Sequence, residues 1–156
     1  MPDAIAAAVD ELEREETYRD IGIASIPDTV EIVILRKSLM GDLSKNPESS
    51  SNLLLARLAQ LPVLKSDLPR IGFFVALGRL GKKKAVPAIV QYLLNLPDDE
   101  VSEIRRINHP FRYALRALER ITGNPLGLGP GENLEALFKT RKETLKMLPG
   151  APASDA

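Results

Sequence analysis

The basic residues with the clearest chemical meaning form a row in the second half of the chain. Arg112, Arg116 and Arg120 are spaced four residues apart, so on a helix they lie along one face. If helices stack, we expect Arg79 and Lys83 from the preceding segment nearby. Such a stripe could bind phosphates or an acidic peptide. The alternative is a solvated face whose arginines pair partly with acidic residues of the same fold.

No arrangement of residues typical of catalysis is visible. The chain has no cysteine and one histidine, His109, which excludes disulfides and thiolate metal sites. Because His109 precedes Pro110, we expect it at a helix start rather than in a nucleophilic triad. The acidic residues within 98–103 are expected to be solvated, with weak divalent-ion binding as the alternative. Residues 127–131 lack the strand and lysine of a phosphate loop. We predict no catalytic residue, no metal site and no cofactor; an enzyme with an unrecognised site is the least favoured alternative.

The composition favours helix-on-helix packing. Of 156 residues, 44% are hydrophobic but only 4% aromatic, without tryptophan, so the core is expected to consist of Leu, Ile, Val and Ala. This length predicts one domain. No run is long enough to span a membrane. Residues 4–9 are apolar but lack a preceding basic region. We expect a cytoplasmic protein, or a periplasmic or secreted one if a leader has been removed.

The net charge is zero, but the charges are unevenly distributed. Residues 1–31 hold nine acidic and two basic residues, whereas 32–156 hold 12 acidic and 19 basic residues. One interpretation is a solvated acidic helix followed by a mildly basic body. The other is that this acidic helix covers part of a basic surface in its own fold.

Apolar spacing and turn residues predict eight helices. We expect loops at 42–51 and 124–131 and a disordered tail at 149–156. The β-branched run at 30–35 is also compatible with a strand, but its continuation to Met40 favours a helix that begins at a capping box and ends at Gly41. The expected helices are 3–19, 28–40, 50–61, 67–80, 85–96, 100–108, 111–123 and 132–147.

The best-defined stretch is 67–94. Asp67 can cap a helix start, and Pro69 is tolerated in its first turn. Gly78 would let a neighbouring helix approach, and Gly81 suits the left-handed conformation that often ends a helix. A second helix follows with Pro87 in its first turn.

A period of about 40 residues recurs along the chain. Predicted helices end at Gly41, Gly81 and Gly123, which are 40 and 42 residues apart. The segment Val-Ala-Leu-Gly-Arg-Leu-Gly at 75–81, followed by Ala-Val-Pro-Ala-Ile at 85–89, resembles a HEAT repeat. HEAT repeats are pairs of antiparallel helices that stack into a solenoid.

The resemblance covers about 28–148 and is clearest in 67–123. It implies an all-α fold, a short right-handed α-solenoid of about three helical pairs plus an N-terminal helix. Residues 1–148 would form one domain, with 1–20 as an acidic capping helix. The Thr-Gly-Asn-Pro segment at 122–125 is similar to the closing unit of some bacterial HEAT-like proteins, which points to a bacterial origin.

A solenoid of this kind exposes a concave surface built from the second helix of each pair. Arg57, Gln91 and Asn95 would lie on that surface. The resemblance therefore implies a non-catalytic scaffold or adaptor that binds a peptide or another protein. The alternative is binding of nucleic acid or another anion along the arginine stripe, although few aromatic residues are available for base stacking.

Overall fold

The computed structural model describes residues 4–14, 39–61, 67–105, 109–129, 131–146 and 148, and all regular structure in these residues is helical. This confirms the predicted all-α class. The elements are α1 (Ala4–Glu13), α4 (Leu39–Ser44), α5 (Pro47–Leu58), α6 (Asp67–Leu80), the 3-10 helix η2 (Lys83–Ala85), α7 (Val86–Asn95), the 3-10 helix η3 (Asp98–Ser102), α8 (Pro110–Thr122), α9 (Leu134–Lys139) and α10 (Arg141–Leu145).

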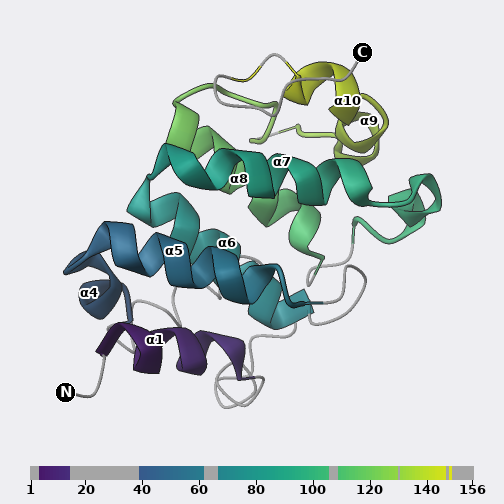
Figure 1. Ribbon diagram of the computed structural model, residues 1–156. Helices are drawn as coiled ribbons and strands as arrows, with labels where there is room; N and C mark the ends of the chain where they lie inside the picture. The colour runs from purple at the N-terminus through teal and green to yellow at the C-terminus, as the bar shows by residue number, and fades with distance from the viewer. Residues whose placement is uncertain are drawn as a thin grey trace.

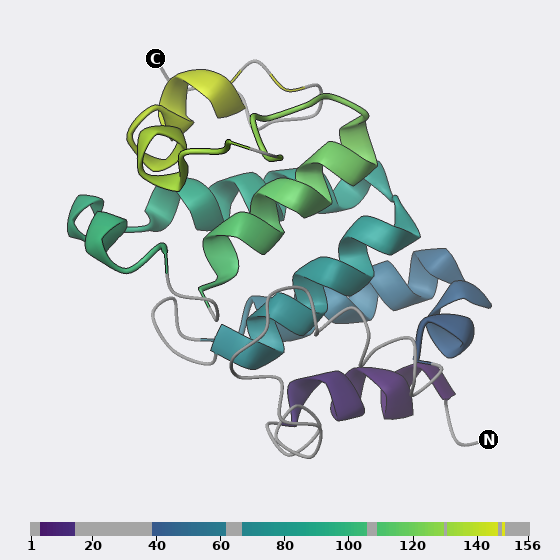
Figure 2. The same cartoon turned by 180° about the vertical axis from the view of Figure 1, so that it is seen from behind.

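The long helices form two layers. In Figure 1, α5 and α7 lie side by side toward the viewer, with α6 and α8 behind them. The reverse view in Figure 2 brings α6 and α8 to the front. Helices α1 and α4 close one end of these layers, and α9 and α10 close the other. The assignment of the helices to HEAT repeats and to a right-handed solenoid stays a prediction.

The core is aliphatic, as the composition predicts, but it is also anchored by aromatic rings. All four phenylalanines are fully buried: Phe73, Phe74, Phe111 and Phe138. The Phe111 and Phe138 ring centroids are 5.4 Å apart in an edge-on arrangement, a favourable geometry for aromatic pairs. This contact joins α8 to α9, so aromatic packing attaches the C-terminal helices to the layers.

Helices α6 and α8 approach closely at Gly78. A β-carbon at Gly78 would lie 3.0 Å from the Cα atom and 3.2 Å from the Cβ atom of Ala117. Only a glycine facing an alanine permits this approach without displacing one backbone. The prediction that Gly78 admits a neighbouring helix is confirmed, and the neighbour is α8.

Two of the three predicted helix-ending glycines end helices. Gly81 and Gly123 follow α6 and α8 with φ angles of 71° and 75°. Their amides donate to the carbonyls of Leu77 and Glu119 at 3.1 and 2.8 Å. These bonds satisfy carbonyls that would otherwise lack partners at the helix end.

The prediction that Gly41 ends a helix is wrong. Gly41 lies inside α4, which continues to Ser44. The predicted loop at 42–51 is wrong as well, because α5 begins at Pro47. Asn46 caps α5 by accepting a hydrogen bond from the Ser49 amide at 3.1 Å. The Asn-Pro pair thus starts a helix instead of breaking one, with proline tolerated in the first turn.

Several predictions fall on residues outside the described ranges. They include most of the helix predicted at 28–40, the competing strand at 30–35 and the tail at 149–156. Helix α1 is described from Ala4 to Glu13, within the predicted 3–19.

The single helix predicted at 132–147 is wrong, because Thr140 divides it into α9 and α10. Thr140 has φ −101° and ψ 10°, and its side-chain hydroxyl donates to the Ala136 carbonyl at 2.9 Å. A threonine that bonds back to the preceding turn commonly bends a helix. The short helix expected at 100–108 is also displaced, since the structure has η3 at Asp98–Ser102.

Candidate functional site

A groove of about 330 Å³ lies between α5 and α7 and opens to solvent on one side. We call it the α5–α7 groove. Its walls are mainly aliphatic side chains of the two helices, and α6 contributes one residue. The lining residues are Leu55, Leu58, Ala59, Leu61, Arg70, Ala88, Gln91, Tyr92 and Asn95.

Helical spacing explains which residues of α7 reach this groove. Ile89, Val90 and Leu93 are buried in the core. Ala88, Gln91 and Asn95 recur every three to four residues on a different face, and this face borders the groove. One face of α7 thus secures the helix, while another is available for recognition.

The groove holds a buried positive charge at Arg70. This side chain is only 3% exposed, and its guanidinium carbon lies 4.8 Å from the centroid of the Tyr92 ring. The Tyr92 ring also packs against Phe74, with 5.1 Å between the ring centroids. Cation–π contact compensates in part for removing the guanidinium from water. Sequence reasoning missed Arg70; the available signal was a single arginine within the apolar run that follows Pro69.

The rim of the groove carries the two amides that the sequence analysis selected. The Gln91 side-chain nitrogen donates to the Asn95 side-chain oxygen at 3.1 Å, and both residues are exposed. The remaining polar atoms of both amides form no further side-chain bond within the described residues. An amide pair of this kind can donate to and accept from a peptide backbone.

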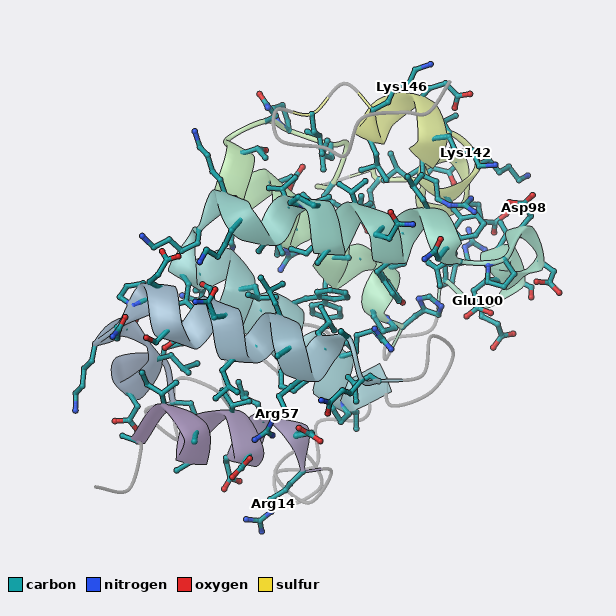
Figure 3. The ribbon with its side chains drawn as sticks, viewed as in Figure 1. Arg14, Arg57, Asp98, Glu100, Lys142 and Lys146 are labelled. Carbon is teal, nitrogen blue, oxygen red and sulfur yellow. The ribbon has the colours of Figure 1, made fainter. Side chains whose placement is uncertain are left out.

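Arg57, also selected from the sequence, does not join these residues. Its guanidinium bonds Glu13 and Asp10 of α1, each at 2.8 Å, and Figure 3 shows Arg57 next to α1. The hydrogen bond that Arg57 donates to Glu13, followed by the one it donates to Asp10, raises the pKa of Arg57. This contact supports the interpretation in which the acidic N-terminal helix covers a basic residue of the body.

The three arginines of the predicted stripe all lie on α8, but their side chains have different neighbours. The Nε atom of Arg112 lies 3.4 Å from a carboxylate oxygen of Glu132. Arg116 and Arg120 lie beside α6 and line a depression at Gly78. This depression has a volume of only about 10 Å³, which is room for about one water molecule and too small for a phosphate group.

The basic residues that follow α6 are partly used within the fold. Lys84 forms an ion pair with Glu48 and donates to the Asn52 side chain at 2.7 Å. Lys82 lies 3.8 Å from the same glutamate. These contacts connect η2 and the residue before it to α5. Lys83 is exposed.

Arg79, the remaining basic candidate, is exposed in the last turn of α6.

His109 is a structural residue at the start of α8, as predicted. Its Nδ1 atom accepts a hydrogen bond from the Phe111 amide at 3.1 Å, so the ring proton resides on Nε2. That nitrogen donates to Glu100 at 2.6 Å. The ring is 2% exposed, and both of its nitrogens are engaged. No group of three or more potential metal ligands occurs in the part of the chain that the structure describes.

Arg141 is the second buried arginine that sequence reasoning missed. Its Nε and terminal nitrogens donate to the carbonyls of Leu93, Leu96 and Phe138 at 2.8–2.9 Å. A fourth bond reaches Asp98 at 3.1 Å. The guanidinium also lies 3.9 Å from the Phe138 ring centroid. It satisfies carbonyls at the C-terminal end of α7, which lack partners within that helix.

No known protein family, curated protein or solved structure matches the chain. Among the described residues, no helix combines the length and hydrophobicity required to cross a bilayer. The geometry therefore defines an all-α protein with a half-open apolar groove between two helices of one layer.

Proposed function

We propose that this protein is a non-catalytic, HEAT-like interaction scaffold that binds a peptide or protein segment in the α5–α7 groove. The observation that supports the proposal is the groove itself, with aliphatic walls, exposed amides at its rim and a buried guanidinium at Arg70. Its volume of about 330 Å³ lies at the lower end of the range for ligand sites. One or two side chains of a partner would fill it.

The repeat interpretation draws support from the equivalent ends of α6 and α8. Both helices end at a left-handed glycine, Gly81 and Gly123, at a separation of 42 residues. They also lie against each other in one layer, with α7 in the other layer between them in sequence. This order is the one expected when successive helical pairs stack.

Recognition would combine burial of apolar area with hydrogen bonds at the rim. A partner side chain that enters the groove would remove Leu55, Leu61 and Ala88 from water, which is the main favourable contribution. Gln91 and Asn95 would bond the partner's backbone and fix its position. Because the walls are helices already packed on the core, little ordering would be needed on binding.

Nucleic-acid or anion binding along the arginine stripe is the less favoured alternative. Arg112 and Lys84 already have carboxylate partners in the fold. A phosphate backbone would have to compete with those carboxylates for the same cations.

The groove can be tested with a displayed library of random peptides selected on the purified protein. We expect the recovered peptides to share an apolar position and to bind the parent protein reproducibly. Ala88→Arg places a long side chain in the groove and should weaken binding at least about tenfold, equivalent to about 1.4 kcal/mol.

Ala56→Arg is the matched control, because Ala56 is exposed on α5 but does not line the groove. It should leave affinity unchanged. Thermal melting of both variants would verify that they fold. The proposal fails if no peptide is enriched, or if Ala88→Arg and Ala56→Arg bind the selected peptides equally well.

A further inference from the structure

A second half-open pocket, of about 350 Å³, lies between η3 and the two C-terminal helices. We call it the C-terminal pocket. It shares no residue with the α5–α7 groove. Its lining residues are Asp98, Val101, Phe138, Lys139, Arg141 and Lys142.

The C-terminal pocket is cationic. It contains three basic side chains and one carboxylate. Asp98 accepts a bond from Arg141 at 3.1 Å, which leaves the two lysines as the excess charge. Lys139 and Lys142 are both exposed, and neither forms an ion pair with another residue of the described ranges. An anionic group would therefore meet two ammonium groups whose charges are not already balanced.

The helix break at Thr140 creates this arrangement. This break separates α9 from α10. Lys139 at the end of α9 and Lys142 in the first turn of α10 then line the same pocket. Arg141 between them is held by four hydrogen bonds. Figure 3 shows Lys142 and Asp98 at the same corner of the molecule. The guanidinium is already fixed, so only the two flanking lysines have to be ordered on binding.

The apolar part of the pocket limits the kind of ligand. The centroid of the Phe138 ring lies 3.9 Å from the guanidinium carbon of Arg141 and 5.4 Å from the centroid of the Phe111 ring. Because the Phe138 ring already makes these two contacts, it is not available for stacking by a nucleobase. Val101 adds a half-buried aliphatic wall. The surroundings suit an aliphatic or aromatic side chain of a partner next to its charged group.

The kind of hydrogen-bond donor distinguishes a carboxylate from a phosphate. The donors come from side chains, and no glycine is among the described residues that line the pocket, whereas phosphate sites commonly use the backbone amides of glycine-rich loops.

We propose that the C-terminal pocket binds an acidic and apolar peptide segment, in which a carboxylate lies between Lys139 and Lys142 and a neighbouring apolar side chain covers Val101. This inference rests on residues distinct from those of the proposed peptide groove. Its success or failure is therefore measured separately.

The test uses a dye-labelled eight-residue peptide of alternating Glu and Phe, and the same peptide with Gln in place of Glu. Binding is followed by fluorescence anisotropy at low ionic strength. We expect the Glu peptide to bind at least about tenfold more tightly than the Gln peptide. The double variant Lys139→Glu with Lys142→Glu should remove that preference, and raised salt should weaken it.

Lys146→Glu is the matched control, since Lys146 is exposed at the end of α10 but does not line the pocket. It should leave the affinity unchanged within about a factor of two. If the double variant fails to fold, Lys139→Gln with Lys142→Gln replaces it.

Three results would overturn the inference. The first is equal binding of the Glu and Gln peptides, and the second is an equal loss with Lys146→Glu, which would indicate a response to net charge alone. The third is competition by inorganic phosphate at concentrations where acetate does not compete, which would assign the pocket to phosphate.

Discussion

Replacement of Arg141 by methionine should destabilise the protein more than any substitution of an exposed residue. Arg141 is 4% exposed and donates to three backbone carbonyls and to Asp98. Methionine preserves much of the aliphatic stem but no donor. The carbonyls of Leu93, Leu96 and Phe138 would then lose charged partners in a buried setting.

The structure allows the size of this effect to be estimated. Hydrogen bonds to a charged group contribute about 1.5–3 kcal/mol each, but their losses are not additive. Three buried carbonyls left without a donor, at about 1–3 kcal/mol each before this non-additivity, suggest a total cost of about 3–5 kcal/mol. For a domain of this length that corresponds to a decrease in Tm of about 6–20 °C.

Urea denaturation and thermal melting, both followed by circular dichroism, would measure the change. Lys142→Met is the matched control, because Lys142 is the exposed neighbour of Arg141, and it should alter stability by no more than about 0.5 kcal/mol. Arg141→Lys should be intermediate, because an ammonium retains the charge but cannot reach all four acceptors at once.

Hydrogen exchange would locate the effect. Amides of α9 and α10 should exchange faster in Arg141→Met than in the parent protein. If Arg141→Met and Lys142→Met melt together and exchange alike, the guanidinium does not attach these helices to α7, and the reasoning is refuted.

Three further predictions concern stability. Gly78→Ala should destabilise the protein by about 1–3 kcal/mol, because the added methyl group overpacks against α8. Gly41→Ala lies at an open helical position and should stabilise the protein by about 0.5–1 kcal/mol. Urea midpoints that change in the same direction for both variants would contradict this pair of predictions. His109→Ala should cost about 1–3 kcal/mol, and His109→Asn should recover part of it because asparagine can still cap α8; identical melting curves would count against the cap. Arg57→Ala should cost at most about 1 kcal/mol at low salt, and less at high salt. Because the pKa of Arg57 is raised, its contribution to the free energy of unfolding is complete below the pKa of an exposed arginine and is lost only as the pH rises further. If the difference in stability between Arg57→Ala and the parent depended strongly on pH near neutrality, this prediction would be wrong.

The parts of the fold that sequence predicted well depend on local physics. Gly81 and Gly123 end helices because a residue in the left-handed conformation is needed there, and glycine adopts that conformation without a steric penalty. The glycine itself therefore marks the helix end in the sequence. The prediction that Gly41 ends a helix was wrong because it used this local rule alone. A glycine is compatible with a helix interior when packing supports the helix, and α4 packs Leu39 and Leu43 into the core.

The candidate sites were less accessible to sequence reasoning. Gln91 and Asn95 could be selected because they lie off the apolar face of a predicted helix. Arg70 and Arg141 were not selected, because an arginine in a sequence is usually exposed; the one signal for Arg70 was its position within an apolar run. The acceptor of Arg141 in α7 lies 48 residues earlier and the one just after α7 lies 45 residues earlier, and no local sequence pattern indicates such a contact.

Helix α7 connects the two proposed sites. One face of α7 presents Gln91 and Asn95 at the rim of the α5–α7 groove. Arg141, which lines the C-terminal pocket, donates to the carbonyl of Leu93 in α7 and to that of Leu96 just beyond it. The same guanidinium thus fixes the end of the helix on which Asn95 lies. A ligand bound in the C-terminal pocket would act on a group that positions the groove, so the two sites share a structural element even though they share no residue.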